Sequence, residues 1–181
     1  MTPEIWAAMI GLAMGAPAVW LYNRLVAERN LARQGFADID VQLKRRADLV
    51  PALVEAVRAY AAHEKALLTS VAELRSAALA APKAAERFMH ERALGERLEK
   101  LILLQENYPA LKADANFRDL SRKLVEVEDA LQYARRFYNG AVKQYLTRIE
   151  TFPDNLMAAA FRFEPLPFFE TGDRQAVKVA L

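Results

Sequence analysis

Apolar residues recur three and four positions apart through most of this chain, and this spacing is the strongest constraint on its fold. Residues at that spacing share one face of an α-helix, so each run of them predicts an amphipathic helix. Three runs have the pattern, over residues 36–74, 94–108 and 117–152. Sustained alternation, which would indicate β-strands, does not occur in the sequence. The chain is therefore predicted to be all-α.

Proline and small residues predict where the helices end. Ala80-Ala81-Pro82 separates the first run from the second, Tyr108-Pro109 ends the second, and Phe152-Pro153 ends the third. Asp114 or Asn116 is then placed to cap the last helix.

Pro51 leaves two interpretations of the first run open. With Asp48 as N-cap, Pro51 would lie in the first turn of a new helix, where its missing N–H costs nothing. One kinked helix is the alternative, because the spacing continues across Pro51. We favour the split, since helices of matched length follow from it; the prediction is an antiparallel up-down four-helix bundle with long helices. Arg46 and Glu64 fall on buried-face positions, so each is expected to have a partner or to lie near a bundle end.

A charge-free segment precedes these runs. Residues 5–23 number 19 and would span roughly 28 Å as a helix, close to the hydrocarbon thickness of a bilayer. Aromatic residues stand at both ends of the segment, with Trp6 at one end and Trp20 and Tyr22 at the other. Tryptophan and tyrosine are typical of membrane–water interfaces. Ala16-Pro17-Ala18 imitates a signal-peptide cleavage site, but the positive charge expected before the apolar stretch is missing. We therefore predict a retained transmembrane helix.

Charge and small residues extend this prediction. Basic residues follow the segment and none precedes it, so the positive-inside rule places the N-terminus outside and the rest of the chain in the cytoplasm. Small residues recur four apart within the segment, a pattern that lets membrane helices associate closely, although such residues are also simply common in membrane helices. They are Ala7, Gly11 and Gly15. A homo-oligomer is one expectation.

The predicted organisation has three parts. Residues 1–23 form the anchor, 24–163 the cytoplasmic helical bundle, and 164–181 a C-terminal tail. The start of that tail is rich in proline and phenylalanine and is expected to lie against the bundle.

Composition and motifs argue against most enzyme classes. The chain has no cysteine, which excludes disulfides and thiolate chemistry. Its formal net charge of +2 is too small to favour nucleic acid as a partner. Metal-binding helices place a Glu three positions before a His or a second His four positions after it, and His63 and His90 have neither, so neither metal nor cofactor is expected. The serines lie outside any G-x-S-x-G turn, and we expect no catalytic residue.

Several stretches, taken in order, resemble a known family. They are YNRLV from Tyr22, DIDVQLKRRADLVPALV from Asp38, YPALKADANF from Tyr108, ARRFYN from Ala134 and TFPDNLMA from Thr151. Together they resemble the LemA family of bacterial membrane proteins over residues 22–170. The resemblance implies a single-pass protein of the bacterial inner membrane with a cytoplasmic helical bundle, and no known reaction. One branch of that family takes part in forming magnetosome membranes.

We therefore expect a membrane-anchored interaction or scaffold protein whose partners are the lipid bilayer, through residues 5–23, and other membrane-associated proteins. Residues of the motif stretches that are candidates for partner contact are Arg45, Arg46, Arg135, Arg136, Tyr138 and Asn139. The alternative for each is a structural role, since arginines often cover apolar surface and Tyr138 lies on a buried face. Two other functions stay open: a membrane-organising or remodelling homo-oligomer, and an enzyme subunit with a site inside the bundle.

Overall fold

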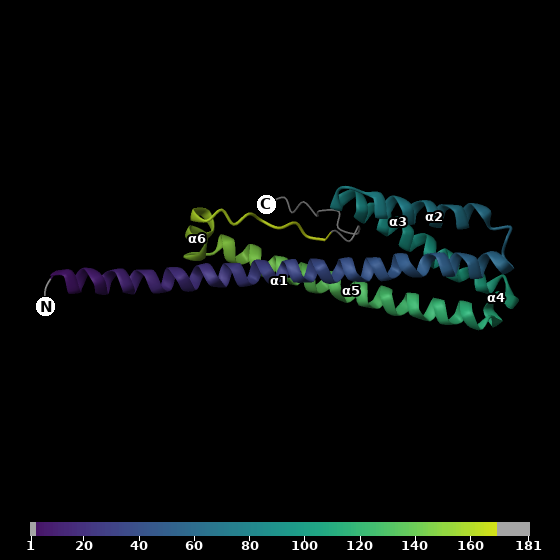
Figure 1. Cartoon of the computed structure of the whole chain (residues 1–181), viewed down its shortest axis with the longest axis horizontal. Helices are drawn as coiled ribbons and strands as arrows, with labels where there is room; N and C mark the ends of the chain where they lie inside the picture. The colour runs from purple at the N-terminus through teal and green to yellow at the C-terminus, as the bar shows by residue number, and fades with distance from the viewer. Residues whose placement is uncertain (1–2, 170–181) are drawn as a thin grey trace, which may run out of the picture. The chain divides into compact units, whose positions relative to one another are not determined.

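The structure is a computed structural model of the 181-residue chain, and it describes the backbone of residues 3–169 and the side chains of residues 15–83 and 86–169. Every regular element in that part of the chain is helical (Figure 1). The helices are α1 (Pro3–Tyr60), α2 (Lys65–Ala80), α3 (Ala84–Leu103), the 3₁₀ helix η1 (Leu104–Glu106), α4 (Pro109–Ala113), α5 (Ala115–Glu150) and α6 (Asp154–Ala160). The predicted all-α class is confirmed.

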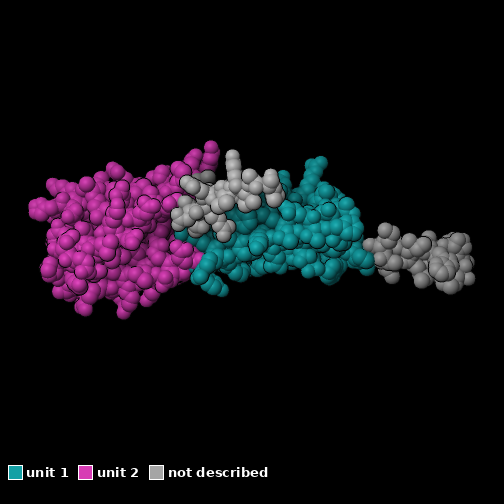
Figure 2. Space-filling view, turned by 180° about the vertical axis from the view of Figure 1, so that it is seen from behind, with its two compact units in different colours: residues 1–39, 133–181 teal, residues 40–132 magenta. Residues whose placement is uncertain are grey.

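The chain divides into two compact units (Figure 2). Unit 1 consists of residues 1–39 and 133–181, and unit 2 of residues 40–132. Helices α1 and α5 each contribute residues to both units. Each unit has its own apolar core, so the packing of each can be described by itself.

The core of unit 2 is built from leucine and valine side chains of α1, α2, α3 and α5, with Leu104 and Leu111 from the short helices. The core of unit 1 contains Leu25, Tyr145, Ala158 and Phe163. Most residues of the predicted apolar faces are buried, as expected from their spacing. Tyr60 and Phe152 are the exceptions, with 41% and 74% of their surface exposed.

The predicted split of the first run at Pro51 is wrong. Helix α1 continues through Pro51, and Asp48 lies exposed within it rather than capping a new helix. A proline in a helix leaves the carbonyl four residues earlier without its N–H donor. Here that carbonyl belongs to Ala47, and the Nε of Arg75 on α2 donates a hydrogen bond to it at 2.7 Å. The neighbouring helix thus supplies the donor that Pro51 lacks.

The chain reverses direction ten residues later instead, between α1 and α2. Ala61 is fully buried at this turn, and the N–H of Glu64 donates to its carbonyl at 3.1 Å. Two tyrosine hydroxyls hold the turn to later elements: Tyr60 donates to Asp114 at 3.0 Å, and Tyr108 donates to Glu64 at 3.2 Å. Glu64 therefore has the partner that its position on the buried face requires.

Of the other predicted boundaries, those at Pro82 and Pro153 are confirmed, but the second helix ends at Leu103 rather than at Tyr108, because the chain passes into η1 there. Helix α2 ends at Ala80 before Pro82, and Pro109 opens α4. The side chain of Asp114 caps α5 by accepting a hydrogen bond from the N–H of Phe117 at 2.7 Å. This bond and that from Tyr60 hold the pKa of Asp114 below its ordinary value, because both favour the carboxylate.

The predicted anchor falls mostly outside the described side chains. The backbone is helical from Pro3, but the side chains before Gly15 are not described, and Ala7 and Gly11 are among them. Gly15 is exposed, and a Cβ atom added there would meet nothing within 4 Å. Within the residues that the structure describes, no helix has the length and apolarity needed to cross a membrane.

Replacing Arg75 with Met should destabilise the chain by about 1 to 3 kcal/mol, because the Ala47 carbonyl loses its donor. The same change in a Pro51→Ala background should cost much less, because the restored N–H of residue 51 takes over that carbonyl. Urea unfolding of the four full-length chains, purified in detergent, measures this double-mutant cycle. Equal costs in both backgrounds would contradict the role given to Arg75.

Candidate functional site

Unit 2 contains a buried arginine. Arg46 on α1 is 1% exposed and forms ion pairs with Glu91 on α3 and with Glu128 on α5, the latter at 2.7 Å. It also donates to the backbone carbonyl of Glu91 at 2.8 Å. A Cβ atom at Gly95 would come within 3.3 Å of its guanidinium, so this glycine leaves room for it. One side chain thereby joins three helices.

The electrostatics of this cluster favour the charged form of Arg46. Burial alone lowers the pKa of Arg46, but the attraction and hydrogen bonds of Glu128 and Glu91 outweigh it and raise that pKa above its ordinary value. The guanidinium is therefore held permanently charged between the two carboxylates. Such a group binds neighbouring helices together and offers no proton for chemistry.

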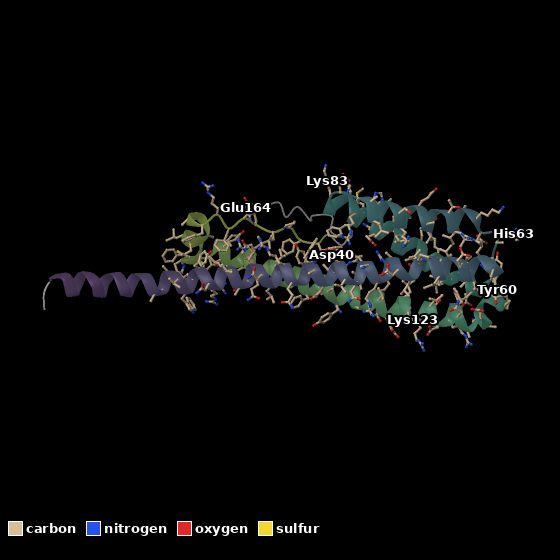
Figure 3. All side chains as sticks on the ribbon, in the orientation of Figure 1. Asp40, Tyr60, His63, Lys83, Lys123 and Glu164 are labelled. Atoms are coloured by element: carbon tan, nitrogen blue, oxygen red, sulfur yellow. The ribbon has the colours of Figure 1, made fainter. Side chains whose placement is uncertain are left out.

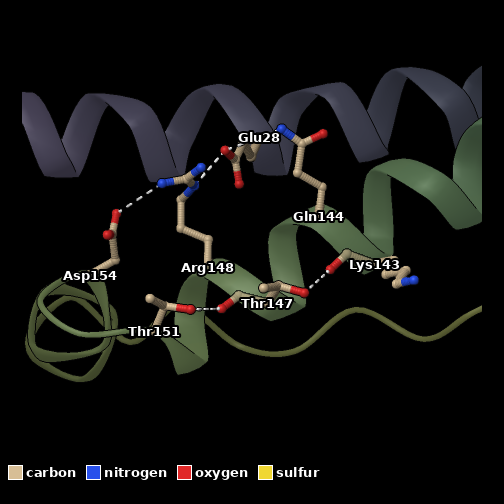
Figure 4. Close-up of polar contacts among 7 residues, drawn as sticks. All are labelled: Glu28, Lys143, Gln144, Thr147, Arg148, Thr151 and Asp154. Atoms are coloured by element: carbon tan, nitrogen blue, oxygen red, sulfur yellow. Dashed lines mark hydrogen bonds and ion pairs between the residues drawn. The ribbon is translucent and has the colours of Figure 1, made fainter.

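Unit 1 contains a second cluster of the same kind (Figure 4). Arg148 on α5 lies between two buried carboxylates, Glu28 on α1 and Asp154 at the start of α6. Its Nε donates to Glu28, and its other end faces Asp154 at 3.6 Å. Gln144 also approaches Glu28, at 3.5 Å. This cluster joins α1, α5 and α6.

A shallow, open hollow of about 390 Å³ lies beside Arg148. Its lining comes from one stretch of α5, namely Gly140, Lys143, Gln144, Thr147, Arg148 and Thr151. The two threonine hydroxyls donate back to carbonyls of their own helix, at 2.9 and 2.6 Å (Figure 4). Arg148 is engaged by Glu28 and Asp154, and the other cation of the lining is the exposed Lys143; a single exposed ammonium does not make a selective site.

The ARRFYN stretch of α5 holds the extended segment that follows α6. The hydroxyl of Tyr138 donates to the carbonyl of Pro167 at 2.7 Å. Asn139 bonds Phe169 twice: its amide donates to the carbonyl at 3.1 Å, and its oxygen accepts from the N–H at 2.8 Å. Burial raises the pKa of Tyr138, so its hydroxyl is protonated at neutral pH and can donate.

Contacts between arginine and aromatic rings also hold this segment against the helices. The guanidinium of Arg135 lies 4.8 Å from the ring centre of Phe169, and Arg29 lies 4.8 Å from that of Phe163. Further along α5, Tyr145 donates to the carbonyl of Glu164 at 2.9 Å. The expected packing of the tail against the helices is thus confirmed for residues 163–169, while residues 170–181 lie outside the described chain.

The six residues expected to contact partners fall into two groups. Arg46, Arg135, Tyr138 and Asn139 are engaged within their own units, as described above. Arg45 and Arg136 are exposed, and Arg45 donates only to Gln42, one turn away on α1, at 3.3 Å. Sequence reasoning missed the partners of Arg46 and the whole Arg148 cluster. One member of the Arg148 cluster could have been found from the sequence, because Asp154 lies inside the TFPDNLMA stretch.

Neither histidine belongs to the ion pairs of the two clusters, although His90 directly precedes Glu91. His63 is exposed in the turn between α1 and α2, at the end of unit 2 where Tyr60 also lies, and His90 is partly buried on α3 (Figure 3). Among the described side chains, no three His, Asp or Glu residues are arranged to hold a metal ion.

Replacing Arg46 with Met should lower the free energy of unfolding by about 3 to 5 kcal/mol, because Glu91 is left buried without its counter-charge. The exposed neighbour Arg45 gives a matched control, and Arg45→Met should change it by less than about 0.5 kcal/mol. Adding Glu91→Met to Arg46→Met should recover part of the loss. Urea unfolding of the full-length chains distinguishes these outcomes, and equal midpoints for the two arginine variants would refute the assignment.

Replacing Asn139 with Ala should loosen the segment that ends at Phe169. Two hydrogen bonds of about 1 kcal/mol each correspond to a roughly 30-fold rise in exchange of the Phe169 amide. Hydrogen exchange read by mass spectrometry on peptides covering residues 163–169 measures this, with Arg136→Ala as the exposed control. Unchanged protection in Asn139→Ala would show that the tyrosine hydrogen bonds and the aromatic contacts hold the segment without Asn139.

Comparison with known proteins agrees with the resemblance found in the sequence. The chain is similar to two curated proteins of Paramagnetospirillum magneticum, magnetosome protein MamQ 1 and magnetosome protein MamQ 2. Each is 23% identical over an alignment of 185 positions that covers 88% of this chain and 68% of the relative. The model of the LemA family matches residues 35–181. Since that match takes in both units and most of the chain, this protein belongs to the LemA family.

Proposed function

We propose that this protein is a membrane-anchored, non-enzymatic scaffold of the bacterial inner membrane. Residues 5–23 cross the bilayer once, the N-terminus lies outside, and both helical units face the cytoplasm. There the units bind other membrane-associated proteins.

The main support for this proposal is helix α1. The charge-free residues 5–23 and the helical units share this one helix, which begins at Pro3 and ends at Tyr60. An anchor joined to the units by continuous helix, rather than by a flexible linker, presents them at a fixed distance from the bilayer surface. Such presentation suits a protein whose role is to hold partners in place.

Family and relatives support a role at membranes. The chain belongs to the LemA family, and the MamQ relatives are named as magnetosome proteins. Arg45 and Arg136 remain the proposed partner contacts, because their side chains are exposed.

A membrane-organising homo-oligomer is the second candidate. It is favoured by the small residues at Ala7, Gly11 and Gly15, whose spacing would let two anchor helices approach closely. An enzyme subunit with a site inside the helices has less support, because the buried carboxylates of both clusters are bound to arginine.

In-cell crosslinking followed by mass spectrometry tests the scaffold. The full-length chain is compared with a variant lacking residues 1–23, and with Arg45→Ala/Arg136→Ala. The matched control is Arg58→Ala, which removes another exposed arginine of α1 that pairs only with Glu55, one turn away. We expect a defined set of membrane neighbours that the truncation abolishes, that the double variant reduces, and that the control retains.

Other results would contradict the proposal. Neighbours that persist without residues 1–23 would show that the anchor is not needed. Self-crosslinks alone, weakened by Gly11→Leu/Gly15→Leu, would favour the homo-oligomer instead. Crosslinking with no specific neighbour would remove the support for either function.

A further inference from the structure

Large apolar side chains are exposed around α6 in unit 1. The exposed fraction is 74% for Phe152 before the helix, 61% for Leu156 within it and 57% for Phe161 after it. We call these three residues the α6 corner. On α1, Val19 and Trp20 are exposed to a similar degree. Leaving such side chains in water forgoes roughly 1.5 to 3 kcal/mol each, so a contact that covers them would be stabilising.

The α6 corner lies beside the end of the charge-free segment. The ring of Phe161 is 4.9 Å from that of Tyr22, and Phe163 is 5.8 Å from the same ring. In Figure 1, α6 lies next to this part of α1. Tyr22 is the second-last residue of the segment 5–23, whose helical length of roughly 28 Å matches the hydrocarbon core. If that segment spans the bilayer, Tyr22 and Phe161 lie together at its boundary.

Charge around the corner fits a bilayer surface. Arg24 directly follows the apolar segment, and its guanidinium lies 5.0 Å from the ring centre of Trp20, one turn earlier. Arg162 follows Phe161 directly, is exposed, and has a positive φ of 53°. Aromatic and aliphatic side chains edged by arginine are the composition of segments that insert at the headgroup–acyl boundary of anionic membranes.

We propose that the α6 corner is a second membrane contact, in which Phe152, Leu156 and Phe161 insert at the headgroup–acyl boundary next to the anchor. This inference rests on the proposed transmembrane segment. Lipid is the occupant because Phe161 of the corner packs against Tyr22, at the end of the segment that the bilayer surrounds. The contact fixes how unit 1 is tilted and rotated on the membrane, which a single helix would leave free.

Site-directed spin labelling tests the contact in the full-length chain. Because the sequence has no cysteine, each single-cysteine variant carries one label. Leu156→Cys and Phe152→Cys probe the corner, Tyr133→Cys is an exposed control on α5 of the same unit, and Gly11→Cys probes the anchor. The chains are placed in vesicles of phosphatidylethanolamine and phosphatidylglycerol. Collisions with oxygen, which enters lipid, and with a polar nickel chelate, which does not, report the depth of each label.

We expect nickel accessibility at positions 156 and 152 to be several-fold lower than at 133, with oxygen accessibility higher. The corner contact would be overturned if nickel reached the labels at 156 and 152 as readily as the label at 133. The anchor would stand in that case if the label at 11 lay in lipid. A label at 11 that is also accessible to nickel would overturn the anchor itself. Spin–spin broadening at 156 that disappears on dilution with unlabelled chain would show a second copy covering the corner, and would overturn the lipid contact.

Discussion

A desolvated arginine between two carboxylates is the interaction on which unit 2 depends. Removing Arg46 from water is costly, and the cost is offset only if both Glu91 and Glu128 are in place. The arrangement is therefore selective as well as stabilising, because a shifted register of α3 or α5 would leave a buried charge unpaired. Arg148 imposes the same condition on α1, α5 and α6 in unit 1. Apolar spacing makes these helices amphipathic, and the two arginines specify which positions meet.

Much of the fold can be predicted from the sequence because it depends on residues that are close together in the chain. The apolar faces, the cap at Asp114 and the boundaries at Pro82 and Pro153 depend on residues near one another in the chain. The error at Pro51 has a different origin. Whether a helix survives a proline depends on finding another donor for the freed carbonyl, and that donor is Arg75, a residue of another helix. The turn after Tyr60 is equally hard to predict, since Glu64 makes no side-chain cap there and the hydrogen bonds that hold the turn involve Tyr108 and Asp114, which are distant in the sequence.

The candidate residues show a similar division. From the sequence, Tyr138 and Asn139 are proposed as partner contacts, whereas the structure shows them bonded to the segment that follows α6. Their partners are backbone groups of Pro167 and Phe169, and a backbone carbonyl has no signature in the residue type. Conversely, the partners of Arg46 are ordinary glutamates among the 23 acidic residues of the chain, and only tertiary packing distinguishes them.

The hydrogen bond from Arg75 to Ala47 also makes the longest helix conditional on its neighbour. Residues 47–51 of α1 lack one of their own backbone bonds, so this turn is weakened whenever α2 is not docked. Undocking α2 would place a hinge at Pro51, and redocking it would remove the hinge. Docking of α2 in unit 2 therefore determines how stiff α1 is at Pro51.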